Sequence, residues 1–154
     1  MIHRTFPARA ATPAIGAVLI VVALAGCSAD GSARSSLSQS AGTAAATSRS
    51  AGLVLGLNED DRLLGTVLDT GLSAAADRLA QEAQSVATMT ALGAIGESRD
   101  RVLSDIRAAQ DEIASAQRAV AAGHDSGTAL DRQRRELDRL AQQLDATSKR
   151  LDEK

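Results

Sequence analysis

Apolar residues recur at a spacing of seven in the C-terminal half of the chain. Over the last 25 residues, leucines occupy every seventh position, and in the preceding stretch apolar residues follow alternating steps of four and three. This is the heptad spacing of helices that pack along a narrow apolar seam. It predicts two helices, over about 97–122 and 128–153. The residues of their seam are Val102, Ile106, Ile113, Val120, Leu130, Leu137, Leu144 and Leu151.

A third helix is predicted over about 58–92. The same alternating steps connect Leu68, Leu72, Ala75, Leu79, Val86 and Met89, with Glu82 at the missing position. Asn58 followed by three acidic residues suits a helix start, because Asn caps free N–H groups and acids oppose the positive end of the helix dipole. Glycine-containing segments at 93–96 and 123–127 separate the three helices.

These elements predict an all-α protein. A five-residue connection between two helices of nearly equal length favours an elongated antiparallel helical hairpin. The helix over 58–92 either joins that hairpin in a three-helix coiled-coil bundle or stays partly detached. The short apolar patch at 53–57 either packs inward or contacts a membrane. Since alanine-rich seams bury little apolar area, a second copy of the chain or a helical partner protein would be an ordinary source of further stability.

Upstream of residue 53 the pattern changes twice. Residues 28–52 are mostly Ser, Ala, Thr and Gly, with Leu37 as the only sizeable apolar side chain. Such a tract buries too little surface to offset its ordering entropy, so it is expected to be a flexible linker. Before it, an apolar run from Ala14 to Leu24 follows Arg4 and Arg9, the arrangement of a secretory signal peptide.

The end of this run carries a specific motif. Leu24, Ala25 and Gly26 precede Cys27, the single cysteine of the chain. The motif resembles the lipobox of bacterial lipoproteins. The resemblance implies attachment of lipid to the Cys27 thiol, cleavage before Cys27, and often acylation of the new amine with a fatty acid such as palmitate.

The resemblance divides the chain into a signal peptide over 1–26, a lipidated cysteine and linker over 27–52, and a helical domain over 53–154. The alternative is an uncleaved membrane anchor, because residues 10–29 contain no charge and about 20 apolar residues can span a bilayer. Both interpretations place the rest of the chain on the extracytoplasmic face of the cell membrane.

The net charge of the chain disfavours some classes of binding partner. The chain has 17 basic and 19 acidic residues, and removal of Arg4 and Arg9 with the signal peptide leaves 15 basic residues and a net charge of −4. This mild acidity argues against binding to nucleic acid or to an anionic lipid surface. The basic cluster Arg132, Arg134, Arg135 and Arg139 is interleaved with acids, as expected for the charged flank of a helix.

No catalytic group, metal site or cofactor is predicted. His124 is the only histidine after the signal peptide and lies in a predicted turn. A zinc site needs three or four ligands, and nucleophilic catalysis needs a base beside the nucleophile. The sequence provides neither, so we expect a non-enzymatic protein that acts as a spacer, scaffold or protein-interaction module at the cell envelope.

Two alternative functions remain open. The order of lipobox, heptads and terminal Lys154 loosely resembles murein lipoprotein, whose C-terminal lysine is joined to peptidoglycan; Asp152 and Glu153 stand where that family has an aromatic and basic ending. The second alternative is a solute-binding or enzymatic lipoprotein. It would need a pocket, which a narrow helical bundle without aromatic residues rarely offers.

Overall fold

The computed structural model describes residues 15–59, 65–122 and 127–153, with side chains from residue 30 onward except those of 58 and 59. It contains helices α1 (Ile15–Glu59), α2 (Gly65–Thr88), α3 (Gly93–Ala121) and α4 (Gly127–Asp152), and no strand in the described ranges. The protein is therefore all-α, as the heptad spacing predicted.

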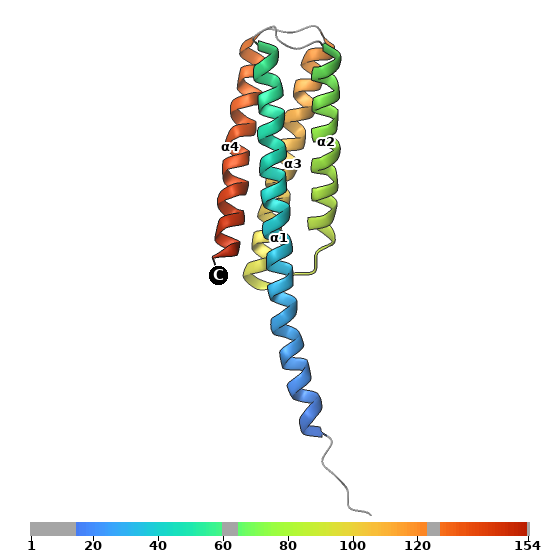
Figure 1. Cartoon of the computed structure of the whole chain (residues 1–154), viewed down its shortest axis with the longest axis vertical. Coiled ribbons are helices and arrows are strands. Elements are labelled where there is room, and N and C mark those ends of the chain that lie inside the picture. Colours follow the sequence, from blue (N-terminus) through green and yellow to red (C-terminus); the bar gives the residue numbers. More distant parts are fainter. Residues whose placement is uncertain (1–14, 60–64, 123–126, 154) are drawn as a thin grey trace, which may run out of the picture.

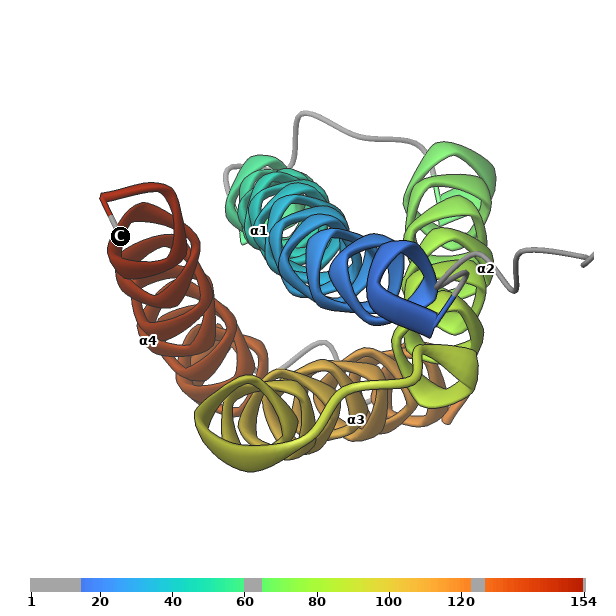
Figure 2. The same cartoon turned by 90° about the horizontal axis from the view of Figure 1, so that it is seen from below.

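The four helices lie side by side and alternate in direction along the chain (Figure 1). Seen along the bundle, α1 is flanked by α2 and α4, and α3 completes the arrangement (Figure 2). The α1–α4 pair makes the most extensive contact. Helix α1 is also the longest, at 45 residues. Its N-terminal part continues beyond the bundle at the end where α4 finishes (Figure 1).

The expectation of a flexible linker over 28–52 is wrong wherever side chains are described, because residues 30–52 belong to α1. Its buried positions follow the same four-and-three steps as the other helices, and small residues occupy all but the two leucines at the ends. These positions are Leu37, Ala41, Ala44, Ser48, Ala51 and Leu55. The tract lacks large apolar side chains of its own, but α4 and α2 supply the surface against which it packs. The bundle consequently has four helices instead of two or three.

Small side chains on α1 let α4 approach closely. A Cβ atom at Gly52 would lie 3.3 Å from Oδ1 of Asp138, and one at Gly42 would lie 3.4 Å from Oγ of Ser148. The hydroxyl of Ser148 donates to the backbone oxygen of Ser38 at 2.9 Å, and the Ser38 hydroxyl donates to the backbone oxygen of Ser148 at 3.2 Å. Reciprocal bonds from such short side chains require neighbouring backbones.

The predicted seam of α3 and α4 lies in the core. Its residues are buried, except that Val120 is partly buried and packs against the core. The two helices are antiparallel neighbours, as predicted for a hairpin (Figure 1). Gln133 and Thr147, which interrupt the leucine pattern, are buried too. Gln133 remains compatible with this position because its Nε2 donates to Oγ of Ser115 at 3.0 Å.

The boundaries around α2 differ from the prediction. Asn58 and Glu59 end α1 instead of starting the next helix, and α2 begins at Gly65. The predicted stripe of α2 is buried apart from Met89, which follows the helix and is partly buried against the core. A Cβ atom at Gly71 would lie 3.2 Å from Cγ1 of Val54, so this glycine permits a close approach of α1 and α2.

The glycine segment at 93–96 starts α3 and does not precede it. Helix α2 ends at Thr88, and α3 begins at Gly93, whose φ of +57° is the left-handed conformation that glycine adopts readily. The patch at 53–57 forms the last turns of α1. Val54 and Leu55 pack inward, which was one of the two predicted alternatives for this patch, whereas Leu53 and Leu57 are exposed.

Candidate functional site at the end of the bundle where α1 projects

The predicted lipobox lies on the projecting part of α1. The backbone of α1 includes Leu24, Ala25, Gly26 and Cys27. The structure describes no side chain for these four residues. Among the described side chains of α1, the first that is fully buried is Leu37, ten positions after Cys27. At 1.5 Å per residue, a continuous helix places these two positions about 15 Å apart. The connection between Cys27 and the core is therefore short and helical, not a coil.

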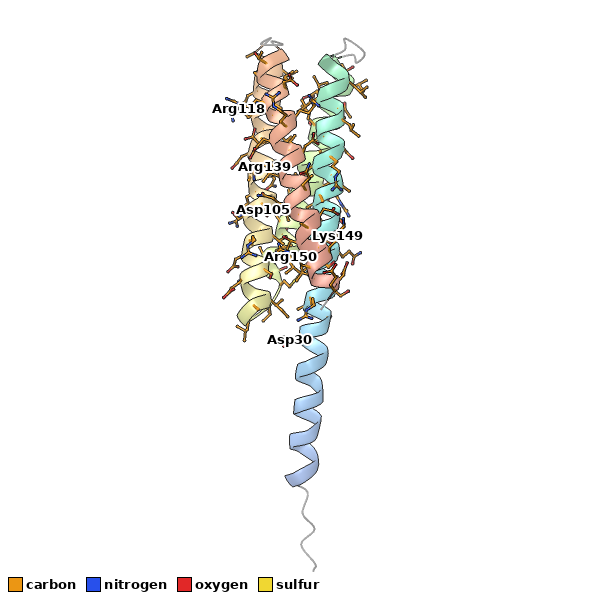
Figure 3. All side chains as sticks on the ribbon, turned by 90° about the vertical axis from the view of Figure 1, so that its left-hand side faces the viewer. Asp30, Asp105, Arg118, Arg139, Lys149 and Arg150 are labelled. Atoms are coloured by element: carbon orange, nitrogen blue, oxygen red, sulfur yellow. The ribbon has the colours of Figure 1, made fainter. Side chains whose placement is uncertain are left out.

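Two further elements meet at this end of the bundle. The connection between α2 and α3 presents Leu92, which is 84% exposed, while neighbouring Ala91 and Ile95 pack against the core. The C-terminal end of α4 lies beside α1, with Lys149 and Arg150 in its last turn (Figure 3). An exposed apolar side chain and basic residues thus share the end from which α1 projects.

A cavity of about 110 Å³ opens between α1, α3 and α4 at this end. Its polar walls consist of Arg34 from α1, Ser98 and Arg101 from α3, and Thr147 and Arg150 from α4. Ile95 and Leu151 supply apolar wall, and none of the described residues that line the cavity carries a carboxylate. The arrangement concentrates positive charge in a small, partly enclosed space.

Asp105 lies next to this cavity, in an adjoining depression that it shares with Arg101 and Arg150. Partial burial raises the pKa of the Asp105 carboxyl, while the charges of Arg139 and Arg101 act in the opposite direction and offset part of the rise. Figure 3 shows Asp105 on α3 and Arg139 on the neighbouring α4. The carboxylate is thus only partly solvated, and two arginines favour its charged form.

A second polar groove lies between α1 and α2. It is lined by hydroxyl and amide side chains and by an ion pair between Arg78 and Glu82 at 3.1 Å. Glu82 is the residue that replaces an apolar side chain in the α2 stripe, and it is buried. Its carboxylate is paired within its own helix, which explains how an acid occupies this position.

The basic cluster on α4 is the charged helix flank that the sequence predicted. Arg134 and Arg135 pair with Asp131 at 2.8 and 3.7 Å, and Arg139 pairs with Glu136. Asp145 and Lys149, an acid four residues before a base, also pair on α4, at 3.0 Å. Glu97 and Arg101 have the same spacing on α3 but are absent from the ion pairs of the described residues. Arg101 lines the cavity instead.

Sequence reasoning missed this cavity because its arginines are far apart in the chain and none belongs to a motif. Among the described side chains, no three potential ligands are grouped as a metal ion would require. His124 and Lys154 lie outside the described residues. None of the helices, as far as the described residues were searched, combines the length and apolar character needed to cross a membrane. Comparisons with protein-family models, with curated proteins and with solved structures found no match to this chain.

Proposed function

We propose that the chain is a non-enzymatic, lipid-anchored helical protein on the extracytoplasmic face of the cell membrane. In this proposal Cys27 carries the lipid, and the four-helix bundle acts as a spacer, scaffold or protein-interaction module. The lipobox-like residues Leu24, Ala25 and Gly26 before Cys27 support the anchor. The packed bundle that follows supports a structural role.

The continuity of α1 is the observation that carries the proposal. Because α1 runs from the projecting segment into the core at Leu37, a lipid on Cys27 would hold the bundle close to the bilayer in a defined orientation. The α2–α3 connection and the C-terminal end of α4 would then face the membrane. The exposed side chain of Leu92 at this end suits contact with lipid.

The opposite end of the bundle would face away from the membrane. Three of the exposed large apolar side chains lie there: Leu53 and Leu57 near the end of α1, and Val67 in the first turn of α2. A contiguous exposed apolar patch is typical of contact surfaces for proteins, and these three residues at one end of the bundle are candidates for such a patch. Their position supports the interaction role within the proposal.

The peptidoglycan tether receives less support from this geometry. An up-and-down bundle of four helices returns its C-terminal end to the side from which it starts, and the C-terminal end of α4 lies at the end where α1 projects (Figure 1). A tether between membrane and cell wall works best with its two attachment points at opposite ends. We therefore favour the spacer or scaffold.

Mass spectrometry of the protein purified from membranes tests the anchor. We expect an N-terminus at Cys27 with added acyl mass in the wild type and in a Ser28→Ala control. Cys27→Ser should retain residues 1–26 and carry no acyl group. Recovery of an intact wild-type N-terminal segment from the membrane fraction would contradict the proposal and favour the uncleaved membrane anchor.

A further inference from the structure

We propose that the cavity lined by Arg34, Arg101 and Arg150 binds the phosphate group of an anionic phospholipid headgroup. The inference rests on the proposed function for its orientation, which turns this end of the bundle toward the bilayer. The binding chemistry itself depends only on the residues of the cavity.

Three permanent positive charges from three different helices converge on this space. A guanidinium group stays protonated in proteins and provides up to five N–H donors in a planar arrangement that matches phosphate oxygens. Arg34 is half-buried, and Arg101 and Arg150 are more exposed. None of the three forms an ion pair with a described carboxylate. Asp105 in the adjoining depression offsets part of this charge, and the remaining repulsion among the three arginines makes the cavity a place where an anion is stabilised.

Each arginine keeps donors available for a ligand. Nε of Arg150 donates to the backbone oxygen of Ala146 at 3.2 Å, and one Nη donates to Oγ1 of Thr147 at 2.9 Å. These bonds orient the side chain and leave its remaining N–H groups free. Arg34 and Arg101 donate no hydrogen bond to a described side chain or backbone oxygen. Charge-assisted bonds to phosphate are stronger than bonds between neutral groups.

The size of the cavity suits one headgroup phosphate. Its volume of about 110 Å³ is of the same order as the engineered cavity of about 150 Å³ that holds a benzene molecule. The apolar walls formed by Ile95 and Leu151 would accompany the glycerol or acyl part of a lipid. The Ser98 hydroxyl donates to the backbone oxygen of Ala94, so its oxygen can accept from a headgroup hydroxyl but does not donate to the phosphate.

The position of the cavity favours lipid as the source of the phosphate. Helix α1 continues beyond the bundle at this same end, and Cys27, the proposed lipid carrier, belongs to this projecting part (Figure 1). A cation acts on an anionic bilayer only within about 8–10 Å at ordinary ionic strength, and the short helical connection supplies this proximity.

The acidic net charge of the chain is compatible with this site because the arginines act locally. Asp30, Glu97, Asp152 and Glu153 also lie toward this end, so the end as a whole is not a basic surface. Binding should therefore occur in the cavity as a saturable event of one headgroup per chain. A diffuse attraction to anionic membranes would have no such limit.

Arginine side-chain NMR of the full chain in lipid nanodiscs tests the site. We expect the Nε–H signals of Arg34, Arg101 and Arg150 to shift saturably as phosphatidylglycerol replaces phosphatidylcholine. The signal of Arg118, on the same α3 helix at the opposite end, should remain unchanged. Replacing all three cavity arginines with Gln should weaken the apparent affinity, measured from lipid-induced thermal stabilisation, by at least about tenfold. Arg118→Gln is the matched control.

Far-UV circular dichroism checks that each variant folds. If the triple variant does not fold, the single variant Arg101→Gln, at an exposed position, replaces it in the test. Shifts caused by soluble glycerol phosphate but not by phosphatidylglycerol would overturn the lipid assignment. Equal stabilisation of the wild type and a folded variant by phosphatidylglycerol would overturn the site. Repeating the titration with the Cys27→Ser chain separates the two proposals, since loss of lipidation removes the anchor but leaves the cavity intact.

Discussion

At the scale of single residues, the fold depends on leucines in the core, on small residues at the helix contacts, and on one partly buried carboxyl group. Gly52 and Gly42 bring α1 against α4, and the reciprocal bonds of Ser38 with Ser148 fit only in that close contact. Partial burial of Asp105 disfavours the charged form of its carboxyl group. Two predictions follow from these residues, one about packing and one about the pH dependence of stability.

Gly52→Leu should destabilise the bundle by about 1–3 kcal/mol, because a large side chain overpacks a close helix contact. Urea unfolding followed at 222 nm measures the change. Gly31→Leu is the control, since no atom lies within 4 Å of its added Cβ and the substitution improves helix propensity. Equal stability of Gly52→Leu and the wild type would mean that α1 and α4 are not in close contact.

Asp105→Asn should raise the melting temperature at pH 7 and weaken its dependence on pH. The raised pKa in the folded state means that the protonated carboxyl favours folding, and this contribution is lost as pH rises through the folded pKa. Asp145 acts with the opposite sign, because a hydrogen bond from Lys149 lowers its pKa, and its contribution is lost on acidification. Melting curves between pH 4 and 7, with exposed Asp77→Asn as control, test the effect. A lower melting temperature for Asp105→Asn would contradict it.

At the scale of elements, α1 and α4 form the principal contact, while the heptad seams of α2, α3 and α4 converge on one core. The leucine stripe of α4 is covered within the chain, since Leu130, Leu137 and Leu144 are buried without a second copy. Stability should accordingly be a property of the monomer.

Leu137→Ala should destabilise the protein by about 2–5 kcal/mol, the range for truncation of a buried leucine. The melting temperature should fall equally at all protein concentrations, because the lost contacts are intramolecular. Leu53→Ala, at a position 69% exposed, should have little effect. A melting temperature of the wild type that rises with concentration would show that another chain contributes to the core.

At the scale of the whole molecule, α1 distinguishes the two ends of the bundle, because it projects from only one of them (Figure 1). It leads from the segment with Cys27 into the core, and the even number of helices returns the chain to the same end. The proposed anchor and the proposed lipid site therefore lie together, and the exposed apolar residues near the end of α1 lie opposite.

Spin-labelled lipid in nanodiscs should broaden the amide signals of 89–92 strongly and those of 53–57 weakly. This result is expected if the end of the bundle from which α1 projects faces the bilayer. Ser32→Pro should reduce the difference, because proline interrupts the helix between Cys27 and Leu37 at an exposed position outside the core. Ser32→Ala is the control. Equal broadening at both ends of the wild type would contradict a fixed orientation.

The sequence by itself determined the helical class, the core faces of α2, α3 and α4, and the charged flank of α4. These features are local, because a leucine at every seventh position or an acid four residues before a base acts within one helix. The resemblance of residues 24–27 to a lipobox is also a local pattern, and the lipidation of Cys27 stays a prediction.

Only the tertiary structure decided that residues 30–52 are a fourth helix, that Gly71 admits Val54, and that Arg34, Arg101 and Arg150 share one cavity. A tract of Ala, Ser and Gly buries little area against water, but the same small side chains allow close contact once α4 provides the opposite surface. None of the three arginines belongs to a sequence motif that would predict a binding site. Their proximity arises from the packing of α1, α3 and α4, which depends on contacts between residues more than 100 positions apart.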